Sequence, residues 1–479
     1  MPWCLPFRTS LGSYVYDTTM NSVLTVSSDL YGVLANAASG ESWSSALARA
    51  PENAKKEYLG LCEAGYLHEN PLEKIEHPLT RSVALRLERQ VGMLILQVTQ
   101  RCNFRCKYCI YSESNDLNRC HSSEEMSFET ACEAIDFYYR HSVDCSEVSI
   151  SFYGGEPLLR LDLIKRVVEY SESLFRGREV LFRLTTNASL LNEEAVRFFT
   201  REGHKFSVLI SLDGPQEIQD KGRVFPDGSG TYSCIMKNLH CIPDICENYA
   251  SIFSFNSVLD TDNSYESIIR MSEDPFVSNC SVQFNFVEKE DRKSDYNPDF
   301  LEQVNYDMFL GYVSYFRDAE PTYPNKLIDY LIKRNRLQEE RLASGSMGEV
   351  SAPSGPCIPG GHRLFVDCSG NFYPCERLSE ANRCMKIGDL RGGFDYDAVE
   401  SMLNVAKSTQ NECSHCWAFQ LCSLCIKSSD EGGKITDRAR LELCEQVRLN
   451  AMDLLGRLAL NAENIKHVSH MGGYFASKK

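Results

Sequence analysis

The stretch QVTQRCNFRCKYC, residues 97–109, decides the interpretation of the fold. It follows the apolar run VGMLILQV (91–98) and places Cys102, Cys106 and Cys109 in CxxxCxxC spacing. Three thiolates from one short loop can hold three irons of a four-iron cluster and leave the fourth iron without a protein ligand. A structural zinc loop is the alternative, but a closed zinc site needs four ligands, and the next cysteine, Cys120, lies eleven residues further on in polar sequence.

Strand-like and helix-like stretches alternate around and after this loop. Their order indicates an α/β fold with a parallel sheet and crossover helices, closed or partly closed into a barrel. Ligand residues should then gather at the carboxyl ends of the strands. We expect strands near 93–99, 148–155, 180–187, 206–214, 251–260 and 281–288, and helices near 128–141, 163–175 and 193–203.

The cysteine triplet after the first barrel strand, with aromatic Phe104 and Tyr108 between the cysteines, resembles the radical S-adenosylmethionine (SAM) superfamily. The resemblance implies a partial (β/α)6 barrel whose open iron is chelated by the amino and carboxylate groups of SAM. Reductive cleavage of SAM would then give methionine and a 5′-deoxyadenosyl radical, the chemistry being the cofactor's and the positioning the protein's.

Further polar residues at the strand ends match the same family. By resemblance, YGGEP (Gly154, Gly155, Glu156 and Pro157) exposes backbone groups and a carboxylate to the methionine ammonium, and Tyr108 is a cofactor contact. TTNAS with Asn187 and SLDGP with Ser211 and Asp213 resemble the contacts to the ribose and the carboxylate. Arg223 is a candidate for the carboxylate or the substrate. The alternative is that these residues are strand-ending turns and helix caps.

The C-terminal cysteines form a second ordered pattern. It resembles the SPASM auxiliary-cluster domain, in which Cys413, Cys416, Cys422 and Cys444 would hold one [4Fe–4S] cluster and Cys357, Cys375 and Cys425 another. Cys425 departs from the usual spacing by one residue. The second set is one thiolate short, so Cys368 or Cys384 completes it, or its iron stays open for a substrate thiolate. Two zinc ribbons are the alternative reading.

Changes in sequence pattern along the chain predict the domain boundaries. Residues 1–86 predict a winged-helix-like module that resembles a leader-peptide recognition element, whose strand edge accepts an extended peptide. The barrel would span 87–333, a polar linker 334–355, and the SPASM domain 356–450, which we expect to be held together by metal more than by a large hydrophobic core. A C-terminal helix and tail would occupy 451–479.

The whole-chain composition narrows the location and the partners. The 479 residues include 21 cysteines, carry a formal net charge of −16 and show no signal-peptide-like or membrane-length apolar run. A reducing cytoplasmic location is therefore expected. The negative charge argues against nucleic acid and membrane partners, because both require a positive face.

The segments GHRLFVDCSGNFYPCERLSE (361–380) and CWAFQLCSLC (416–425) resemble thioether-forming maturases of cysteine-rich peptides, the ranthipeptide and sactipeptide class. This resemblance implies SAM, three [4Fe–4S] clusters, a precursor peptide bound through its leader and an electron donor such as flavodoxin or ferredoxin. Glu376, next to Cys375, would act as a base or support a ligand, or is a solvated carboxylate. The alternatives are a carbon–carbon cross-linking or epimerising peptide maturase, a sulfatase-type (formylglycine) maturase, and a non-enzymatic zinc-organised binding protein.

Overall fold

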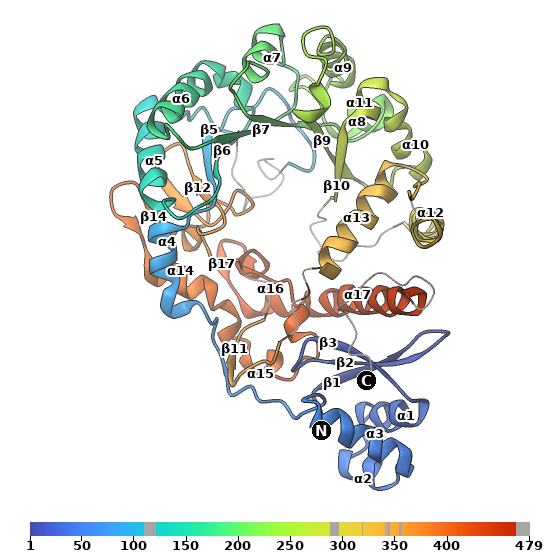
Figure 1. Cartoon of the computed structure of the whole chain (residues 1–479). Helices are drawn as coiled ribbons and strands as arrows, with labels where there is room; N and C mark the ends of the chain where they lie inside the picture. Colours follow the sequence, from blue (N-terminus) through green and yellow to red (C-terminus); the bar gives the residue numbers. More distant parts are fainter. Residues whose placement is uncertain are drawn as a thin grey trace.

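The structure is a computed structural model that describes residues 1–109, 121–287, 297–318, 320–340, 342, 345–353 and 357–465. Figure 1 shows an arc of strands and helices in the upper half and the C-terminal and N-terminal parts below it. In the described part of the chain, no helix combines the length and the apolar character needed to cross a membrane.

The arc is built from six parallel strands of a ten-stranded sheet with the order β10-β9-β8-β7-β6-β5-β12-β13-β14-β15. The predicted α/β class and the parallel barrel strands are therefore confirmed. The bounds of the six strands are β5 (Leu94–Thr99), β6 (Val148–Gly154), β7 (Val180–Thr186), β8 (Phe206–Ser211), β9 (Phe253–Leu259) and β10 (Ser281–Phe286).

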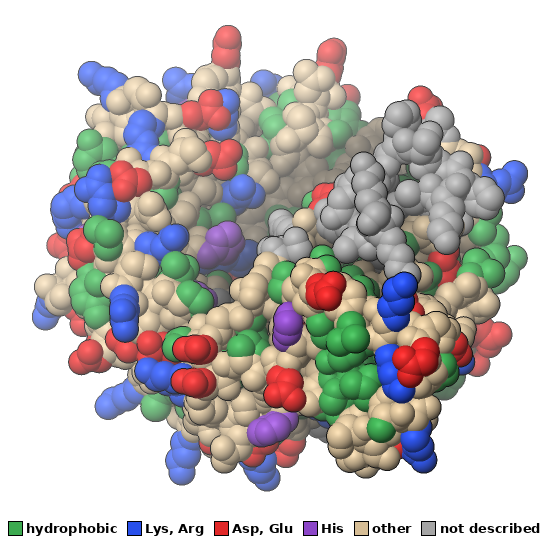
Figure 2. All heavy atoms as spheres, turned by 60° about the horizontal axis from the view of Figure 1, so that its bottom comes forward, with side chains coloured by type: hydrophobic (Ala, Val, Ile, Leu, Met, Phe, Trp, Pro, Cys, Tyr) green, Lys and Arg blue, Asp and Glu red, His purple; other side chains and the backbone are tan. Residues whose placement is uncertain are grey.

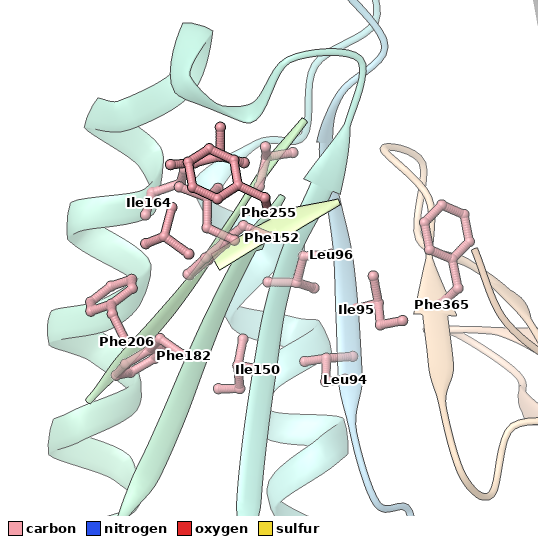
Figure 3. Packing of buried hydrophobic residues seen from close by; sticks show 14 of the residues in the cluster. Leu94, Ile95, Leu96, Ile150, Phe152, Ile164, Phe182, Phe206, Phe255 and Phe365 are labelled. Carbon is pink, nitrogen blue, oxygen red and sulfur yellow. The ribbon is translucent and has the colours of Figure 1, made fainter. Parts of the chain in front are cut away.

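Crossover helices cover one face of these strands and leave the opposite face lining the inside of the arc (Figure 1). They are α5 (Phe128–His141), α6 (Leu161–Leu174), α7 (Glu193–Phe199), α8 (Gln216–Gly222), α9 (Tyr232–His240), α10 (Tyr265–Ile269) and α11 (Pro275–Asn279). Alternate strand residues such as Phe152, Phe182 and Phe206 are buried on the helix side, together with Ile164 of α6 (Figure 3). Burial of these apolar side chains is the main favourable term in the packing of the two layers.

The sheet does not end with the barrel. β12 (Leu364–Val366) pairs in parallel with β5, and the antiparallel strands β13 (Asn371–Tyr373), β14 (Gly388–Asp389) and β15 (Gly393–Phe394) follow. Phe365, Phe372 and Leu403 belong to the same buried cluster as the barrel strands. The expectation that the C-terminal lobe lacks a large core is wrong for this part, because its apolar side chains complete the core of the barrel.

The N-terminal part has its own small core. β1 (Cys4–Arg8), β2 (Ser13–Asp17) and β3 (Ser22–Val26) form an antiparallel sheet in the order β1-β2-β3. The helices α1 (Ser28–Ala38), α2 (Trp43–Ala48) and α3 (Glu52–Glu63) follow, and Ser27 caps α1 by accepting a hydrogen bond from the Leu30 amide. A cluster that includes Val15, Leu24 and Leu34 joins the sheet to the helices.

The remaining elements connect these parts. They are β4 (Lys74–Ile75), α4 (Val83–Arg89), α12 (Pro298–Arg317), α13 (Lys326–Glu340), β11 (Val350–Ser351), α14 (Tyr396–Leu403), α15 (Gln410–Cys413), β16 (Asp430–Glu431), β17 (Lys434–Ile435), α16 (Asp437–Leu441) and α17 (Cys444–Ile465). The predicted linker begins too early, because α13 continues to Glu340 with Leu331, Ile332 and Glu339 buried on one face. β11 within the same segment pairs with β4.

Helix α17 touches three parts of the molecule. It begins at Cys444, which is a candidate ligand residue. In its middle, the buried Arg457 donates from Nε to Glu339 of α13 at 3.2 Å. Near its end, Glu463 accepts a hydrogen bond from the Tyr14 hydroxyl of β2 at 2.8 Å. The helix therefore connects the barrel, the N-terminal sheet and the C-terminal cysteines.

Candidate active site

The three thiols of the CxxxCxxC loop lie close together at the carboxyl end of β5. Burial, together with the nearby charges of Glu156, Cys106 and Cys109, raises the pKa of Cys102 to about 12, although a hydrogen bond from the Phe104 amide opposes this shift. Burial raises the pKa of Cys106 to about 11, although the Arg223 guanidinium opposes this shift. Three clustered, largely buried sulfur donors from one loop fit a group of several irons. Cys120, the next cysteine, lies outside the described residues.

The YGGEP turn is held directly against this loop. The amide of Gly155 donates to the Thr99 carbonyl at 2.8 Å, and the amide of Glu156 donates to the Arg101 carbonyl at 2.8 Å. A Cβ on Gly154 would lie 2.1 Å from the Thr99 oxygen, and a Cβ on Gly155 would lie 2.0 Å from the Arg101 oxygen. Only glycine permits this close approach of the two backbones.

Glu156 ties the ends of two neighbouring strands together. Its carboxylate is buried and accepts hydrogen bonds from the Leu158 amide at 3.0 Å, the Thr186 hydroxyl at 2.7 Å and the Asn187 amide at 2.7 Å. Burial raises the pKa of this carboxyl group, and the three donors partly offset the shift. Pro157 begins the short 3₁₀ helix (Pro157–Arg160) that the same carboxylate caps. Glu156 is thus a structural residue of the turn in addition to a candidate cofactor contact.

Asn187 connects the end of β7 to the cysteine loop. Its Nδ2 donates to Oδ1 of Asn103 at 2.9 Å, and Asn103 in turn donates from Nδ2 to the Ser189 hydroxyl at 2.8 Å. Ala188, which lies between Asn187 and Ser189 in the chain, has a positive φ of 61°. The sequence reasoning identified Asn187 but missed Asn103 and Ser189. The position of Asn103 directly after Cys102 was the available signal.

Asp213 and Arg223 form a buried pair that anchors the other side of the loop. Arg223 donates from Nε to Oδ2 of Asp213 at 3.0 Å and from Nη2 to Oδ1 at 3.2 Å. The Tyr108 hydroxyl donates to the same carboxylate, and the Arg223 guanidinium lies 5.3 Å from the centre of the Tyr108 ring. The two residues therefore contact each other and the cysteine loop, a positioning role that the resemblance did not imply. Ser211, at the end of β8 and two positions before Asp213, is also buried.

Four C-terminal thiols surround one cavity of about 230 Å³. It is lined by Cys413, Cys416, Cys422 and Cys444 and by apolar residues such as Phe419 and Leu424. Burial raises the pKa of Cys422 and of Cys444, and the charges of Cys413 and Cys416 add to both shifts. Among the described residues, no three His, Cys, Asp or Glu side chains converge as they would on a single metal ion. A cavity of this size with sulfur at its walls has room for a multi-atom group, which fits an iron–sulfur cluster.

The other three predicted C-terminal ligands form a second group. Burial raises the pKa of Cys375 to about 11, with further contributions from Glu376, Cys357 and Cys425. Burial and the charge of Cys425 also raise the pKa of Cys357. The charges of Cys357, Cys375 and Cys425 therefore act on one another, and their role as ligands of one cluster stays a prediction that is one donor short of a full set.

Neighbouring candidates have other contacts. The thiol of Cys368 donates to the backbone oxygen of Gln97 in β5 at 3.2 Å, and Cys384 is exposed. Glu376 forms an ion pair with Arg363, so its carboxylate already has a cationic partner.

Comparison with known proteins identifies the barrel. The part of the chain that holds the parallel sheet and the three thiols after its first strand, residues 96–267, matches the family model described as the radical SAM superfamily. This part of the chain is therefore a radical SAM domain. The family implies SAM and a [4Fe–4S] cluster as cofactors.

Some relatives match a part of the chain no longer than this domain, and others match most of the chain. The chain is 32% identical over 151 residues to the serine-type anaerobic sulfatase-maturating enzyme of Bacteroides thetaiotaomicron, spanning 31% of this chain and 36% of that protein. It thus spans about a third of the length of that relative. It is 26% identical to the radical SAM cyclopropyl synthase TigE of Paramaledivibacter caminithermalis over 75% of this chain and 73% of TigE. The solved structure of native anSMEcpe with bound AdoMet shares the fold, with a TM-score of 0.55 and 19% identity over 77% of this chain and 99% of that chain.

Proposed function

We propose that this chain is a radical SAM maturase that modifies a ribosomally made precursor peptide. The observation that carries the proposal is the packing of the Cys102, Cys106 and Cys109 loop against the glycine turn of β6. This packing brings the cysteine loop against the backbone of the glycine turn at the carboxyl ends of the strands, where parallel barrels hold their ligands.

The three thiols of this loop would hold a [4Fe–4S] cluster, and Gly154, Gly155, Glu156, Asn187 and Ser211 would line the position of SAM. When bound, these cofactors supply a 5′-deoxyadenosyl radical that removes a hydrogen atom from the substrate. The protein fixes the geometry of the reaction. The Asp213–Arg223 pair and Tyr108 hold the loop from one side, and the Asn187–Asn103 contact holds it from the other.

Two auxiliary [4Fe–4S] clusters complete the proposal. Cys413, Cys416, Cys422 and Cys444 would ligate one cluster in the cavity that they line. Cys357, Cys375 and Cys425 would ligate the other, whose remaining iron would accept a thiolate of the substrate. Among the described residues no two cysteines form a disulfide, which suits metal ligation and a reducing cytoplasmic location.

The N-terminal sheet would bind the leader of the precursor. β1 and β3 are its edge strands, and the edge of a sheet can accept an extended peptide as an added strand. A reduced flavodoxin or ferredoxin would supply the electron.

The leading reaction is thioether formation between a cysteine sulfur and a carbon of the same peptide. The 5′-deoxyadenosyl radical would take one hydrogen atom from the carbon, the thiol would lose its proton, and the remaining electron would pass to an auxiliary cluster, for a net loss of two hydrogens. Anaerobically reconstituted protein with dithionite and SAM should form 5′-deoxyadenosine, and the product peptide should lose about 2 Da per bridge by intact-mass analysis. Failure to form deoxyadenosine overturns the maturase proposal, while deoxyadenosine with an unchanged peptide mass indicates epimerisation.

A second candidate is the formation of carbon–carbon bonds, which the similarity to TigE, a cyclopropyl synthase, favours. A precursor in which every cysteine is replaced by serine separates the two reactions. Continued loss of two hydrogens would exclude thioethers, whereas loss of the mass change supports them. A sulfatase-type maturase is a third candidate, and oxidation of a cysteine or serine in a sulfatase-derived peptide would support it.

A further inference from the structure

The six parallel strands of the barrel, all of which the structure describes, contain one charged side chain. It is Arg183 in the middle of β7. The other five strands carry neither acidic nor basic residues. The chain has a formal net charge of −16, so a single positive side chain among otherwise uncharged barrel strands points to a specific role for Arg183.

Arg183 lies on the inner face of the barrel. Along β7, Val180, Phe182 and Leu184 are buried, and Figure 3 shows Phe182 on the helix side of the sheet. Successive strand residues point to opposite faces, so Arg183 faces the inside of the arc. The register places it level with Ser151 of β6 and Ser207 of β8. All three residues are partly exposed, so the inner wall at this level is accessible and polar.

The side chain is directed away from the cysteine loop. Its Nε donates to the hydroxyl of Ser149 at 3.1 Å. Ser149 precedes Ser151 by two positions in β6 and lies level with Leu181, toward the amino ends of the strands. A group bound by this guanidinium therefore sits in the interior of the barrel, and not at the strand ends where SAM is proposed to lie.

The guanidinium has donors left for a ligand. Among the described residues, Ser149 is its hydrogen-bond partner and no carboxylate forms an ion pair with it. Its neighbours on the wall are serine hydroxyls, which are neutral. An arginine with Nη1 and Nη2 unoccupied presents a planar fork that matches the two oxygens of a carboxylate.

We propose that Arg183 is a binding residue for a carboxylate of the substrate peptide, held inside the barrel below the SAM site. The carboxylate comes from an Asp or Glu side chain near the modified position or from the C-terminus of the peptide. This inference rests on the proposed function in one respect, namely that the substrate is a peptide. Ser149 holds the guanidinium in place, and Arg183 thereby sets which residue of the peptide faces the radical.

The test uses the reconstituted holoenzyme and three synthetic probes that carry a neutral BODIPY label. They are a peptide with the internal sequence Gly-Ser-Glu-Ser-Gly and an amidated C-terminus, the same peptide with Gln in place of Glu, and the Gln peptide with a free C-terminal carboxylate. Fluorescence anisotropy should show that at least one carboxylate peptide binds about tenfold more tightly than the neutral peptide, the effect of a charge-assisted pair. The carboxylate peptide that shows the preference identifies the source of the group.

Substitutions test whether Arg183 causes the preference for carboxylate peptides. Arg183→Gln should bind all three peptides equally, and Arg183→Lys should keep part of the preference. Arg197→Gln, an exposed arginine on α7, is the matched control and should keep all of it. Circular dichroism and iron content establish that each variant is folded and loaded. Equal binding of the three peptides to the unaltered enzyme, or an undiminished preference in folded Arg183→Gln, overturns the inference. Because binding needs no turnover, this result is independent of whether deoxyadenosine is formed.

Discussion

The loop of Cys102, Cys106 and Cys109 and the loop from Cys413 to Cys425 both gather thiols, but they are supported differently. In the first loop, Arg105 and Lys107 donate backbone hydrogen bonds to Val224 and Gly222, and buried side chains hold both flanks. The second loop consists of short helical turns and wraps a cavity, and Thr18 and Gln420 connect it to the N-terminal sheet. The first loop is therefore held from both sides by the barrel, whereas the second loop is built from short turns around a cavity.

The largest expected effect is the loss of deoxyadenosine formation when a cysteine of the first loop is replaced. Cys106→Ala should reduce deoxyadenosine formation to background, because the cluster loses one of three thiolates. Liquid chromatography of the dithionite reaction measures the product. Cys241→Ala, an exposed cysteine next to α9, is the control and should retain full activity. Residual turnover in Cys106→Ala above that background would mean that this loop is not the site of SAM cleavage.

A smaller effect is expected from the buried ion pair beside the first loop. Asp213→Asn leaves the Arg223 guanidinium buried without its carboxylate, so the free energy of unfolding should fall by about 3 kcal/mol. Urea denaturation of the anaerobic protein measures this change. Glu193→Gln, which removes an exposed ion pair with Arg197, should change stability by less than about 0.5 kcal/mol. A cost for Asp213→Asn as small as that of the control would show that the pair does not anchor the loop.

The glycine turn provides a further test of how the barrel organises its thiols. Gly155→Ala places a Cβ 2.0 Å from the Arg101 oxygen, so the two backbones must separate, at a cost of about 2 kcal/mol. The affinity for SAM, measured by equilibrium dialysis, should fall together with the stability. Gly60→Ala in α3 is the matched control, because its Cβ meets nothing within 4 Å, and it should stabilise the protein by about 0.5–1 kcal/mol. Unchanged SAM binding in Gly155→Ala would contradict the role of the turn.

The smallest expected effect is a change in the protection of backbone amides from hydrogen exchange when metal is removed from the unaltered protein. Removing iron and sulfide should increase amide hydrogen exchange in residues 413–425 more than in β5 to β8, because the core of the barrel is independent of metal. Mass spectrometry of holo and metal-free protein measures both regions in one experiment. Equal loss of protection in the two regions would show that the barrel also depends on its cluster.

Much of the fold could be predicted from the sequence because its signals are local. The helix expected over 128–141 is α5 with the same bounds, where Ser127 caps the first turn and the buried face follows helical spacing. The strands of the barrel were equally clear from their apolar and β-branched runs. The extent of the C-terminal core was not, because Phe365 and Phe372 lie on strands of three residues whose burial comes from pairing with β5, far away in the sequence.

The candidate site was predictable in its thiols and less so in their supports. Cysteine spacing is a local pattern, so the candidate thiols could be identified from the sequence. Their division into two C-terminal ligand sets came from the resemblance to the SPASM domain and stays a prediction, although Cys413, Cys416, Cys422 and Cys444 line one cavity. The contact of Asn103 with Asn187 and the pairing of Tyr108 with Asp213 join residues 84 and 105 positions apart. Such hydrogen bonds leave no periodicity, so a sequence alone cannot distinguish a residue that touches a cofactor from one that steadies the loop beside it.

The length of α17 sets the spacing between three contacts that lie far apart along one helix, at Cys444, Arg457 and Glu463. A single inserted residue would rotate everything after it by about 100° and advance it by about 1.5 Å. Arg457 would then turn away from Glu339, and Glu463 from Tyr14, while Cys444 stayed in the cavity wall. Insertions and deletions that accumulate as such proteins diverge should therefore spare residues 444–463.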